Sequence, residues 1–371
     1  MIPDCTLTTA CFDLSKYNNN SRNIEDIKHQ ITPLLNIPCY LVIYTDESCI
    51  DAIKSVRESF SLSHITKYIV TKIEDLPFYK YNIMIKSNRT SYWPTRDERT
   101  SSESHIVCCS KFTFVLNTMN DNPFQTGKFG WIDSFVGPNF SKICEDYSPD
   151  MLIDVLHRSF DNKFSIQVLA SVDKKYLKPV NKREYYATYR YLVCGCLFIT
   201  NKQIGIKILQ RLNELFISTT TQGYGHGEEM LYLEVLDEFY HDIHKSYGDY
   251  GQILNNFFHP MRYYRYVYKF LIHQNLYDFG NHRESYDCAK ELQYVIEQKG
   301  VKAEADIYMA TLIARYKSSL EVNPIESIHR IADIYDACKN DDTMKVEFEK
   351  YKGYHIELFK KCPLFIEKNY K

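Results

Sequence analysis

Short apolar runs alternate with stretches of helical spacing over the first 70 residues, and this alternation restricts the fold more than any other feature of the sequence. Residues 39–44 form a continuous apolar run after Pro38, as expected for a strand that is buried on both faces. The same reasoning predicts strands at 4–11 and 68–70, with helices over 24–34 and 50–56 between the three strands. This order predicts a mostly parallel sheet covered by helices on both faces, with ligands at the carboxyl ends of its strands.

Later segments extend the same sheet. The run 128–133 (KFGWID) is apolar and ends abruptly in a carboxylate, and further strands are expected at 164–170 and 191–199. A helix that carries apolar residues from Val107 to Met119 precedes them. Residues 88–105 are polar and lack periodicity, so we expect a long loop there, of the kind that forms lids or is disordered.

The rhythm changes near residue 260, where helix follows helix without strand signals. We therefore expect an α/β domain over residues 1–260 and a helical region over 261–371. The spacing resembles helical-hairpin repeats but is too irregular for tetratricopeptide repeats, so a cap on the α/β domain and a partner-binding solenoid are both open. The expected helices lie near 261–277, 283–299, 303–319, 323–338 and 343–360.

Composition excludes some classes of protein. The 371 residues hold 45 Lys and Arg against 47 Asp and Glu, a net charge of -2, which argues against nucleic-acid binding driven by bulk charge. Aromatic residues make up 15% of the chain. This fraction fits either an AT-rich genome, such as that of a large DNA virus, or a surface that stacks on sugars or bases.

The start of the chain and its cysteines predict a compartment. Residues 1–13 have neither the basic leader nor the apolar run of a signal peptide, and no apolar run approaches the ~20 residues of a membrane helix. The 12 cysteines include no C-x-x-C pair, which argues against a structural zinc site or a thioredoxin-like centre. We expect a cytoplasmic protein without a membrane span, and a virus-encoded protein that acts in the host cytoplasm is one form of this expectation.

Asp133 is the first candidate functional residue. A carboxylate at the exit of a buried strand is costly to desolvate unless a cation pairs with it. In an α/β fold that binds nucleotides, a divalent metal would bridge this carboxylate to a diphosphate. The alternative is a structural role in which Asp133 caps a turn.

A glycine-rich segment, 223–229 (GYGHGEE), precedes an apolar stripe that indicates a helix. Glycines let the backbone approach a ligand closely, and Glu228 or Glu229 could serve as general base for a hydroxyl. Both acids also suit a helix N-terminus, so simple capping is the alternative. Residues 247–256 gather Asp, Gln and Asn between aromatic rings, either to bind sugar hydroxyls or as a plain polar turn. His241 and His244 would share a helix face, without a third metal ligand nearby in the sequence.

Several short motifs together carry a family resemblance. They are Thr6–Asp13 (TLTTACFD), Tyr44–Asp46 (YTD), Asn122–Phe124 (NPF), Phe129–Asp133 (FGWID), Cys194–Phe198 (CGCLF), Glu228–Glu229 and Tyr247–Tyr250 (YGDY). Their order and spacing resemble those of the HtrL/YibB (WlaTC/HtrL) family of proposed glycosyltransferases, across roughly residues 4–275.

The resemblance implies a GT-A-type fold, in which one α/β sheet binds a nucleotide-sugar donor at its strand ends beside an acceptor groove. On the matching positions, Thr8, Ala10 and Asp13 would line the base and ribose. Lys111 would reach the phosphates, and Asp133 would hold the diphosphate together with a divalent metal, manganese or magnesium. The strand 194–198 would form the floor of the acceptor site, and Glu228 or Glu229 would supply the catalytic carboxylate.

One position departs from the family pattern. A full Asp-x-Asp motif needs a second acid at position 135, where this chain has Phe135. Either a carboxylate from elsewhere, such as Asp249, completes a metal site, or positive side chains replace the ion.

The leading hypothesis is therefore a glycosyltransferase that moves a sugar from a nucleotide-sugar donor, with a UDP-sugar favoured, to a hydroxyl of a glycan or protein acceptor. One alternative is a catalytically decayed protein that binds a partner through its helical region, and another is a nucleotide-sugar hydrolase. No nucleic-acid partner is expected. The oligomeric state is left open, with a homo-oligomer among the options.

Overall fold

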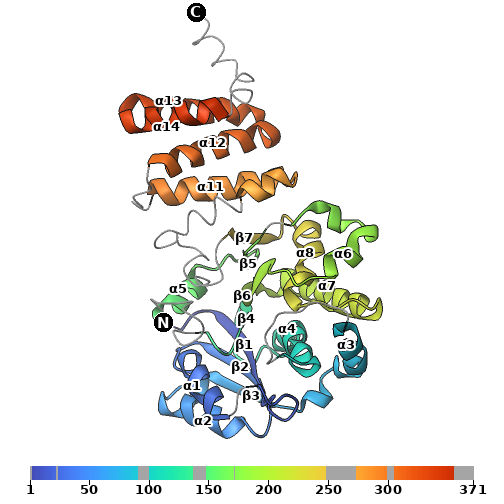
Figure 1. Ribbon diagram of the computed structural model, residues 1–371. Helices are drawn as coiled ribbons and strands as arrows, with labels where there is room; N and C mark the ends of the chain where they lie inside the picture. Colours follow the sequence, from blue (N-terminus) through green and yellow to red (C-terminus); the bar gives the residue numbers. More distant parts are fainter. Residues whose placement is uncertain are drawn as a thin grey trace, which may run out of the picture. The chain divides into compact units, whose positions relative to one another are not determined.

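The computed structural model describes residues 2–21, 24–90, 100–136, 148–170, 172–247, 273–298 and 305–354. The chain divides into two compact units (Figure 1). The first comprises Met1–Ala170 and Lys175–Phe258, and the second comprises Ser171–Lys174 and His259–Lys371.

The described part of the first unit is built on one seven-stranded sheet. Its strands are β1 (Cys5–Cys11), β2 (Tyr40–Thr45), β3 (Thr66–Val70), β4 (Lys128–Ile132), β5 (Phe164–Val168), β6 (Val193–Asn201) and β7 (Ile243–Tyr247). Their order across the sheet is β3-β2-β1-β4-β6-β5-β7, and neighbours run parallel except β6, which is antiparallel to both β4 and β5.

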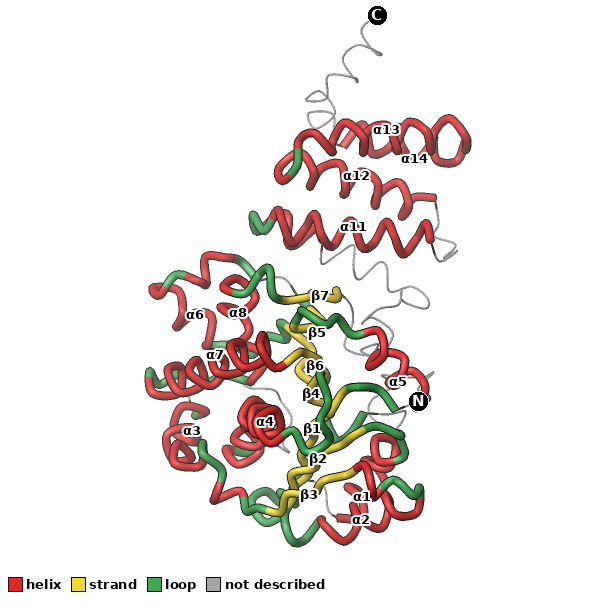
Figure 2. Tube along the Cα trace, turned by 180° about the vertical axis from the view of Figure 1, so that it is seen from behind, coloured by secondary structure: helices red, strands yellow, loops and turns green. Residues whose placement is uncertain are grey.

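Helices cover both faces of this sheet. They are α1 (Ile24–Leu35), α2 (Ile50–Ser59), α3 (Asn82–Arg89), α4 (Ser102–Asp121), α5 (Pro149–Arg158), α6 (Lys182–Tyr186), α7 (Lys202–Thr221) and α8 (Tyr232–Glu238). Figure 2 shows α1, α2 and α5 on one side of the sheet and α3, α4 and α7 on the other. The fold class expected from the sequence, a mostly parallel sheet flanked by helices, is confirmed.

Strand β1 lies between β2 and β4, and all seven of its residues are buried. Two of its threonine hydroxyl groups have partners in the surrounding elements: Thr6 Oγ1 lies 2.6 Å from Thr126 Oγ1, and Thr8 Oγ1 donates to Thr118 Oγ1 over 3.0 Å. Parallel β1 and β4 end at the same edge of the sheet, where antiparallel β6 begins. The last residues of β1 and β4 and the first residues of β6 therefore lie at the same edge.

The entry into α4 differs from the expected long loop over 88–105. Ser101 and Ser104 form a reciprocal cap in which each side chain binds the backbone N–H of the other, and the helix begins at Ser102. Such a cap satisfies two N–H groups that the first turn of a helix leaves without partners, so the polar segment 102–105 is helical. Residues 91–99 lie outside the described part of the chain.

The expectation that His241 and His244 share a helix face is wrong. Residues Ile243–Tyr247 form β7, which pairs in parallel with β5, and His241 lies in the turn that precedes it. Pairing with a neighbouring strand overrides the local spacing that suggested a helix.

Arg57 of α2 is fully buried and binds backbone carbonyl groups. Its two terminal nitrogens donate to Leu35 O over 3.0 Å, to Ile37 O over 2.8 Å and to Cys39 O over 3.1 Å. Its Nε donates to Thr66 Oγ1 over 2.7 Å. The guanidinium therefore joins the end of α1, the connection to β2 and the start of β3.

The second unit is helical in its described part, as expected. Its helices are α11 (His282–Gln298), α12 (Ala305–Val322), α13 (Pro324–Asn340) and α14 (Asp342–Tyr354), each packed on the next. Most of the helix expected over 261–277 lies outside the described residues. None of the described helices in either unit is both long and apolar enough to cross a membrane.

Candidate functional site

A cavity of about 290 Å³ lies at the carboxyl edge of the sheet in the first unit. The ends of β1 and β4 contribute residues such as Ala10, Trp131 and Asp133, and α4 contributes Cys108 and Lys111. Because ligands bind open α/β sheets outside the carboxyl ends of their strands, this cavity is the candidate binding site.

Lys111 is the centre of the polar network beside this cavity. Its side chain is only 2% exposed, and Nζ lies 3.4 Å from Asp133 Oδ1 and 3.2 Å from Glu228 Oε1. Nζ also donates to Gly195 O over 3.0 Å. One ammonium group thus connects α4, the residue after β4, the first half of β6 and the 3₁₀ turn Glu228–Leu231.

The pair of acids determines the charge state of Lys111. Burial alone would lower the pKa of the ammonium group, but Asp133 and Glu228 outweigh burial and raise the pKa well above its ordinary value. Lys111 is therefore positively charged at neutral pH. A buried charge is costly unless it is paired, so the loss of Lys111 would leave the charges of the two acids without compensation.

Gly195 makes room for this network. A Cβ atom at this position would lie 3.3 Å from Glu228 Oε1 and 3.4 Å from Lys111 Nζ. The first distance is tighter than an ordinary van der Waals contact, and the second lies at the lower limit of one. The glycine inside the apolar run of β6 therefore lets two charged side chains approach the strand closely.

Glu229 is buried behind Gly195. Its carboxyl group accepts a hydrogen bond from Gly195 N–H over 3.2 Å and another from Tyr189 Oη over 3.0 Å. Burial, followed by the nearby charge of Glu228, raises the pKa of this carboxyl group to about 8. At neutral pH the protonated, neutral form of Glu229 prevails.

The glycine-rich segment before these acids also has a steric role. A Cβ atom on Gly227 would lie 2.3 Å from Tyr189 Cε2, so the backbone there passes directly against the ring that binds Glu229. The expected helix starts later than the acids: Glu228–Leu231 is a 3₁₀ turn and α8 begins at Tyr232.

The structure brings together some of the residues proposed from the sequence and separates others. Ala10, Lys111 and Asp133 line the cavity, and Glu228 reaches Lys111. The Thr8 hydroxyl is used in packing against α4, since it donates to Thr118. The Asp13 carboxylate holds its own turn, with Oδ1 accepting from Ser15 N–H over 2.9 Å.

Asp133 is the described carboxylate that could hold the expected metal. Trp131 Nε1 donates to Asp133 Oδ1 over 2.5 Å, and Lys111 approaches the same oxygen, which leaves Oδ2 for another ligand. Magnesium and manganese often bind one protein carboxylate together with phosphate oxygens and waters, so this donor set fits such an ion. Phe135 lines the cavity where a second acid would stand in the motif, and Asp249 lies outside the described residues.

Sequence reasoning missed two residues of this network. Tyr189 carries no motif, and only the fold places its hydroxyl group on Glu229. Trp131 lies within a quoted motif, but its hydrogen bond to Asp133 depends on the conformation of the chain at the end of β4.

A comparison with protein-family models agrees with the resemblance seen in the motifs. The model of a family described as bacterial proteins of unknown function (HtrL_YibB) matches residues 3–152, the part of the chain that contains β1 to β4. This chain thus resembles the HtrL/YibB family there, as expected from its sequence. Among solved structures, it is similar to mouse xyloside xylosyltransferase 1 in its apo form, with a TM-score of 0.35 and 10% identity over 65% of this chain and 84% of that one. No curated protein matches the sequence.

Proposed function

We propose that the first unit is a glycosyltransferase that moves a sugar from a nucleotide-sugar donor, with a UDP-sugar favoured, to a hydroxyl group of a glycan or protein. The observation that carries the proposal is the cluster of Lys111, Asp133 and Glu228 beside a cavity at the carboxyl edge of the sheet. The family resemblance supports the same assignment, because residues 3–152 include the residues that line the cavity.

The charges of this cluster determine what a diphosphate needs in order to bind. Lys111, Asp133 and Glu228 together carry one positive and two negative charges, so without a further cation they repel a diphosphate. A magnesium or manganese ion at Asp133 would neutralise the diphosphate of the donor. Lys111 pairs with Asp133 and fixes the orientation of its carboxylate, and Trp131 donates to the same oxygen.

The incoming hydroxyl group needs a base within hydrogen-bond reach. We favour Glu228 for this role, because it is paired with Lys111 and its side chain is 16% exposed. Glu229 is the second candidate. As a neutral carboxylic acid at pH 7 it would position β6 through Gly195, rather than accept a proton.

Donor binding is the first expected outcome. With magnesium or manganese present, we expect one class of nucleotide sugar to raise the melting temperature by roughly 5 °C or more at a hundredfold excess over Kd. The panel comprises uridine, guanosine, thymidine and cytidine diphosphate sugars, each with and without the metal ion, read by thermal shift.

The matched variants for this experiment are Asp133→Asn and Asp121→Asn. Asp133→Asn should remove the metal-dependent shift, since the amide cannot supply the anionic ligand. Asp121 is an exposed carboxylate of the same unit, paired with Lys67, so its variant should keep the shift. A metal-dependent shift that survives Asp133→Asn would place the donor elsewhere.

Replacement of Glu229 by glutamine tests its protonation state. The folded-state pKa lies above the unfolded value of ~4.3, so the folded protein holds this proton more tightly. The neutral carboxyl group therefore contributes to the free energy of unfolding. This contribution is complete below about pH 4, decreases as the pH rises, and is lost once the pH passes about 8. Glutamine mimics the neutral acid at every pH. We therefore expect Glu229→Gln to melt close to wild type near pH 4, above it at pH 6, and above it by the widest margin near pH 9.

The neighbouring carboxylate provides the comparison. Glu228→Gln should show no such gain at high pH, because it removes a carboxylate that is paired with Lys111. If the difference in melting temperature between wild type and Glu229→Gln stayed constant from pH 6 to pH 9, the carboxyl group of Glu229 would already be ionised at neutral pH.

A further inference from the structure

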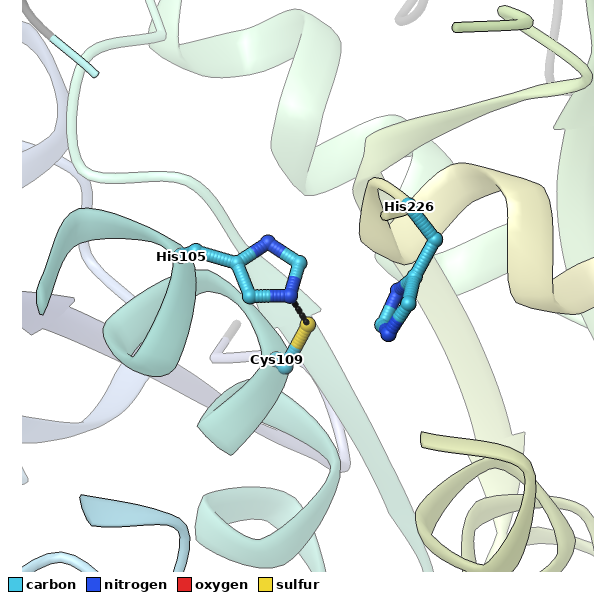
Figure 3. A group of neighbouring side chains, drawn as sticks. All are labelled: His105, Cys109 and His226. Carbon is cyan, nitrogen blue, oxygen red and sulfur yellow. Dashed lines mark hydrogen bonds between the residues drawn. The ribbon is translucent and has the colours of Figure 1, made fainter. Parts of the chain in front are cut away.

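Three side chains that commonly bind metals, other than Asp133, meet inside the first unit. His105 and Cys109 lie one turn apart on α4, and His226 faces them from the loop between α7 and the turn Glu228–Leu231 (Figure 3). One possible ligand atom from each residue lies within 4.8 Å of the other two. A search of the described residues for three or more His, Cys, Asp or Glu side chains placed to hold a metal ion finds this group.

All three side chains are withdrawn from solvent. The exposed fractions of His105, Cys109 and His226 are 7%, 0% and 3%. Polar atoms in such a place normally have hydrogen-bond partners, yet His226 Nδ1 is buried without one. A buried, unsatisfied imidazole nitrogen next to a thiol and a second imidazole requires an explanation.

The distances already suit a shared ion. His105 Nε2 lies 3.7 Å from Cys109 Sγ. Zinc bonds of about 2.3 Å to sulfur and about 2.0 Å to nitrogen, at a tetrahedral angle, place the two ligand atoms about 3.6 Å apart. This agreement means that α4 alone presents two ligands with the correct spacing. The ligand atom of His226 lies within 4.8 Å of the other two, so His226 would have to approach them further to complete the set.

The surroundings prepare His226 to bind through Nδ1. Its Nε2 lies 3.1 Å from Thr220 Oγ1, so a proton on Nε2 can be donated to this hydroxyl group, which leaves the lone pair on Nδ1. The nitrogen that binds a metal is the one that carries the lone pair, so this tautomer offers Nδ1 as the ligand atom.

We propose that His105, Cys109 and His226 bind one zinc ion in the first unit, with water as the fourth ligand. Two imidazoles and a thiolate favour zinc over magnesium or manganese, which prefer oxygen ligands. On binding, the Cys109 thiol loses its proton to solvent and the sulfur forms the bond to zinc, with no change in oxidation state.

The ion would join two segments that carry the candidate active-site residues. Cys109 lies two positions before Lys111 on α4, and His226 lies two positions before Glu228. A bond between these segments holds Lys111 and Glu228 at the separation seen in the structure. The role is structural, and the proposal stands whether or not the first unit transfers sugars.

The test uses the full chain purified from zinc-supplemented medium. Elemental analysis should find about one zinc per chain. After exchange with cobalt, the absorption spectrum should show a thiolate-to-cobalt charge-transfer band and intense tetrahedral bands in the visible region. Cys109→Ser should lose the charge-transfer band, and His226→Gln should lower the zinc content at least tenfold.

Two controls keep the result specific. Cys108→Ser changes the adjacent thiol on the same helix and should keep both the zinc and the band. Asp133→Asn should also keep the zinc, which separates this ion from any metal bound with a donor. If Cys109→Ser fails to fold, His226→Gln decides by zinc content alone. Absence of zinc from the wild-type chain together with a cobalt spectrum that lacks the thiolate band would overturn the proposal.

Discussion

Replacement of Lys111 by methionine is expected to abolish sugar transfer and to lower the free energy of unfolding by about 3–5 kcal/mol, the usual effect of removing one partner from a buried ion pair. Methionine fills a similar volume but leaves Asp133, Glu228 and the carbonyl group of Gly195 without their shared cation. The two carboxylates would then repel each other in a poorly solvated place. Chemical denaturation and an activity assay with the donor found by thermal shift would measure both effects.

A double variant separates lost charge from lost volume. Lys111→Met combined with Glu228→Gln removes one of the two unpaired acids, so it should recover a large part of the lost stability while remaining inactive. Lys67→Met is the matched control, because Lys67 pairs with Asp121 in an exposed position, and its effect should stay below about 1 kcal/mol. If Lys111→Met were as stable as Lys67→Met, the network would not be a coupled unit.

The second large effect is expected at Arg57, far from the cavity. Arg57→Met should lower the free energy of unfolding by about 3 kcal/mol or more, because buried carbonyl groups of Leu35, Ile37 and Cys39 would lose their donor. Each unsatisfied buried group costs about 1–3 kcal/mol. The measurement is urea denaturation followed by far-ultraviolet circular dichroism.

Conservative and exposed variants make this prediction specific. Arg57→Lys keeps the charge but lacks the planar fork that reaches several carbonyl groups at once, so its stability should lie between those of wild type and Arg57→Met. Arg158→Met removes an arginine that is half exposed and paired with Asp154 within one helix, and it should change stability by less than about 1 kcal/mol. Equal effects of Arg57→Met and Arg158→Met would contradict the structural role of Arg57.

Six of the seven strands, β1 to β6, could be predicted from local patterns, because each has its own apolar run, whereas β7 was predicted to be helical. The run 39–44 corresponds to β2, and the run 128–133 corresponds to β4 and the acid after it. The direction of β6 could not be predicted in this way. The residue pattern of 191–199 does not show that this strand pairs antiparallel to β4, because the direction of a strand depends on the path of the chain that connects it to its neighbour.

Local sequence patterns likewise identify only some residues of the candidate site. Asp133 could be found because a carboxylate directly follows an apolar run, and Glu228 because it follows a glycine-rich segment. Thr8 and Asp13 were proposed from their positions in the family resemblance, and their roles stay predictions; in the structure, Thr8 donates to Thr118 and Asp13 accepts from Ser15. The spacing of His105 and Cys109 on one helix face was present in the sequence, but His226 joins them only through the fold.

The late position of β6 in the chain also affects how the protein is made. Strands β1 to β4 all lie within the first 132 residues, so this part of the sheet can form while the ribosome is still adding later residues. Gly195 and Glu228 emerge later, and until they do, Lys111 and Asp133 have no complete partner network. A growing chain therefore cannot retain the donor through this network before most of the first unit has been synthesised.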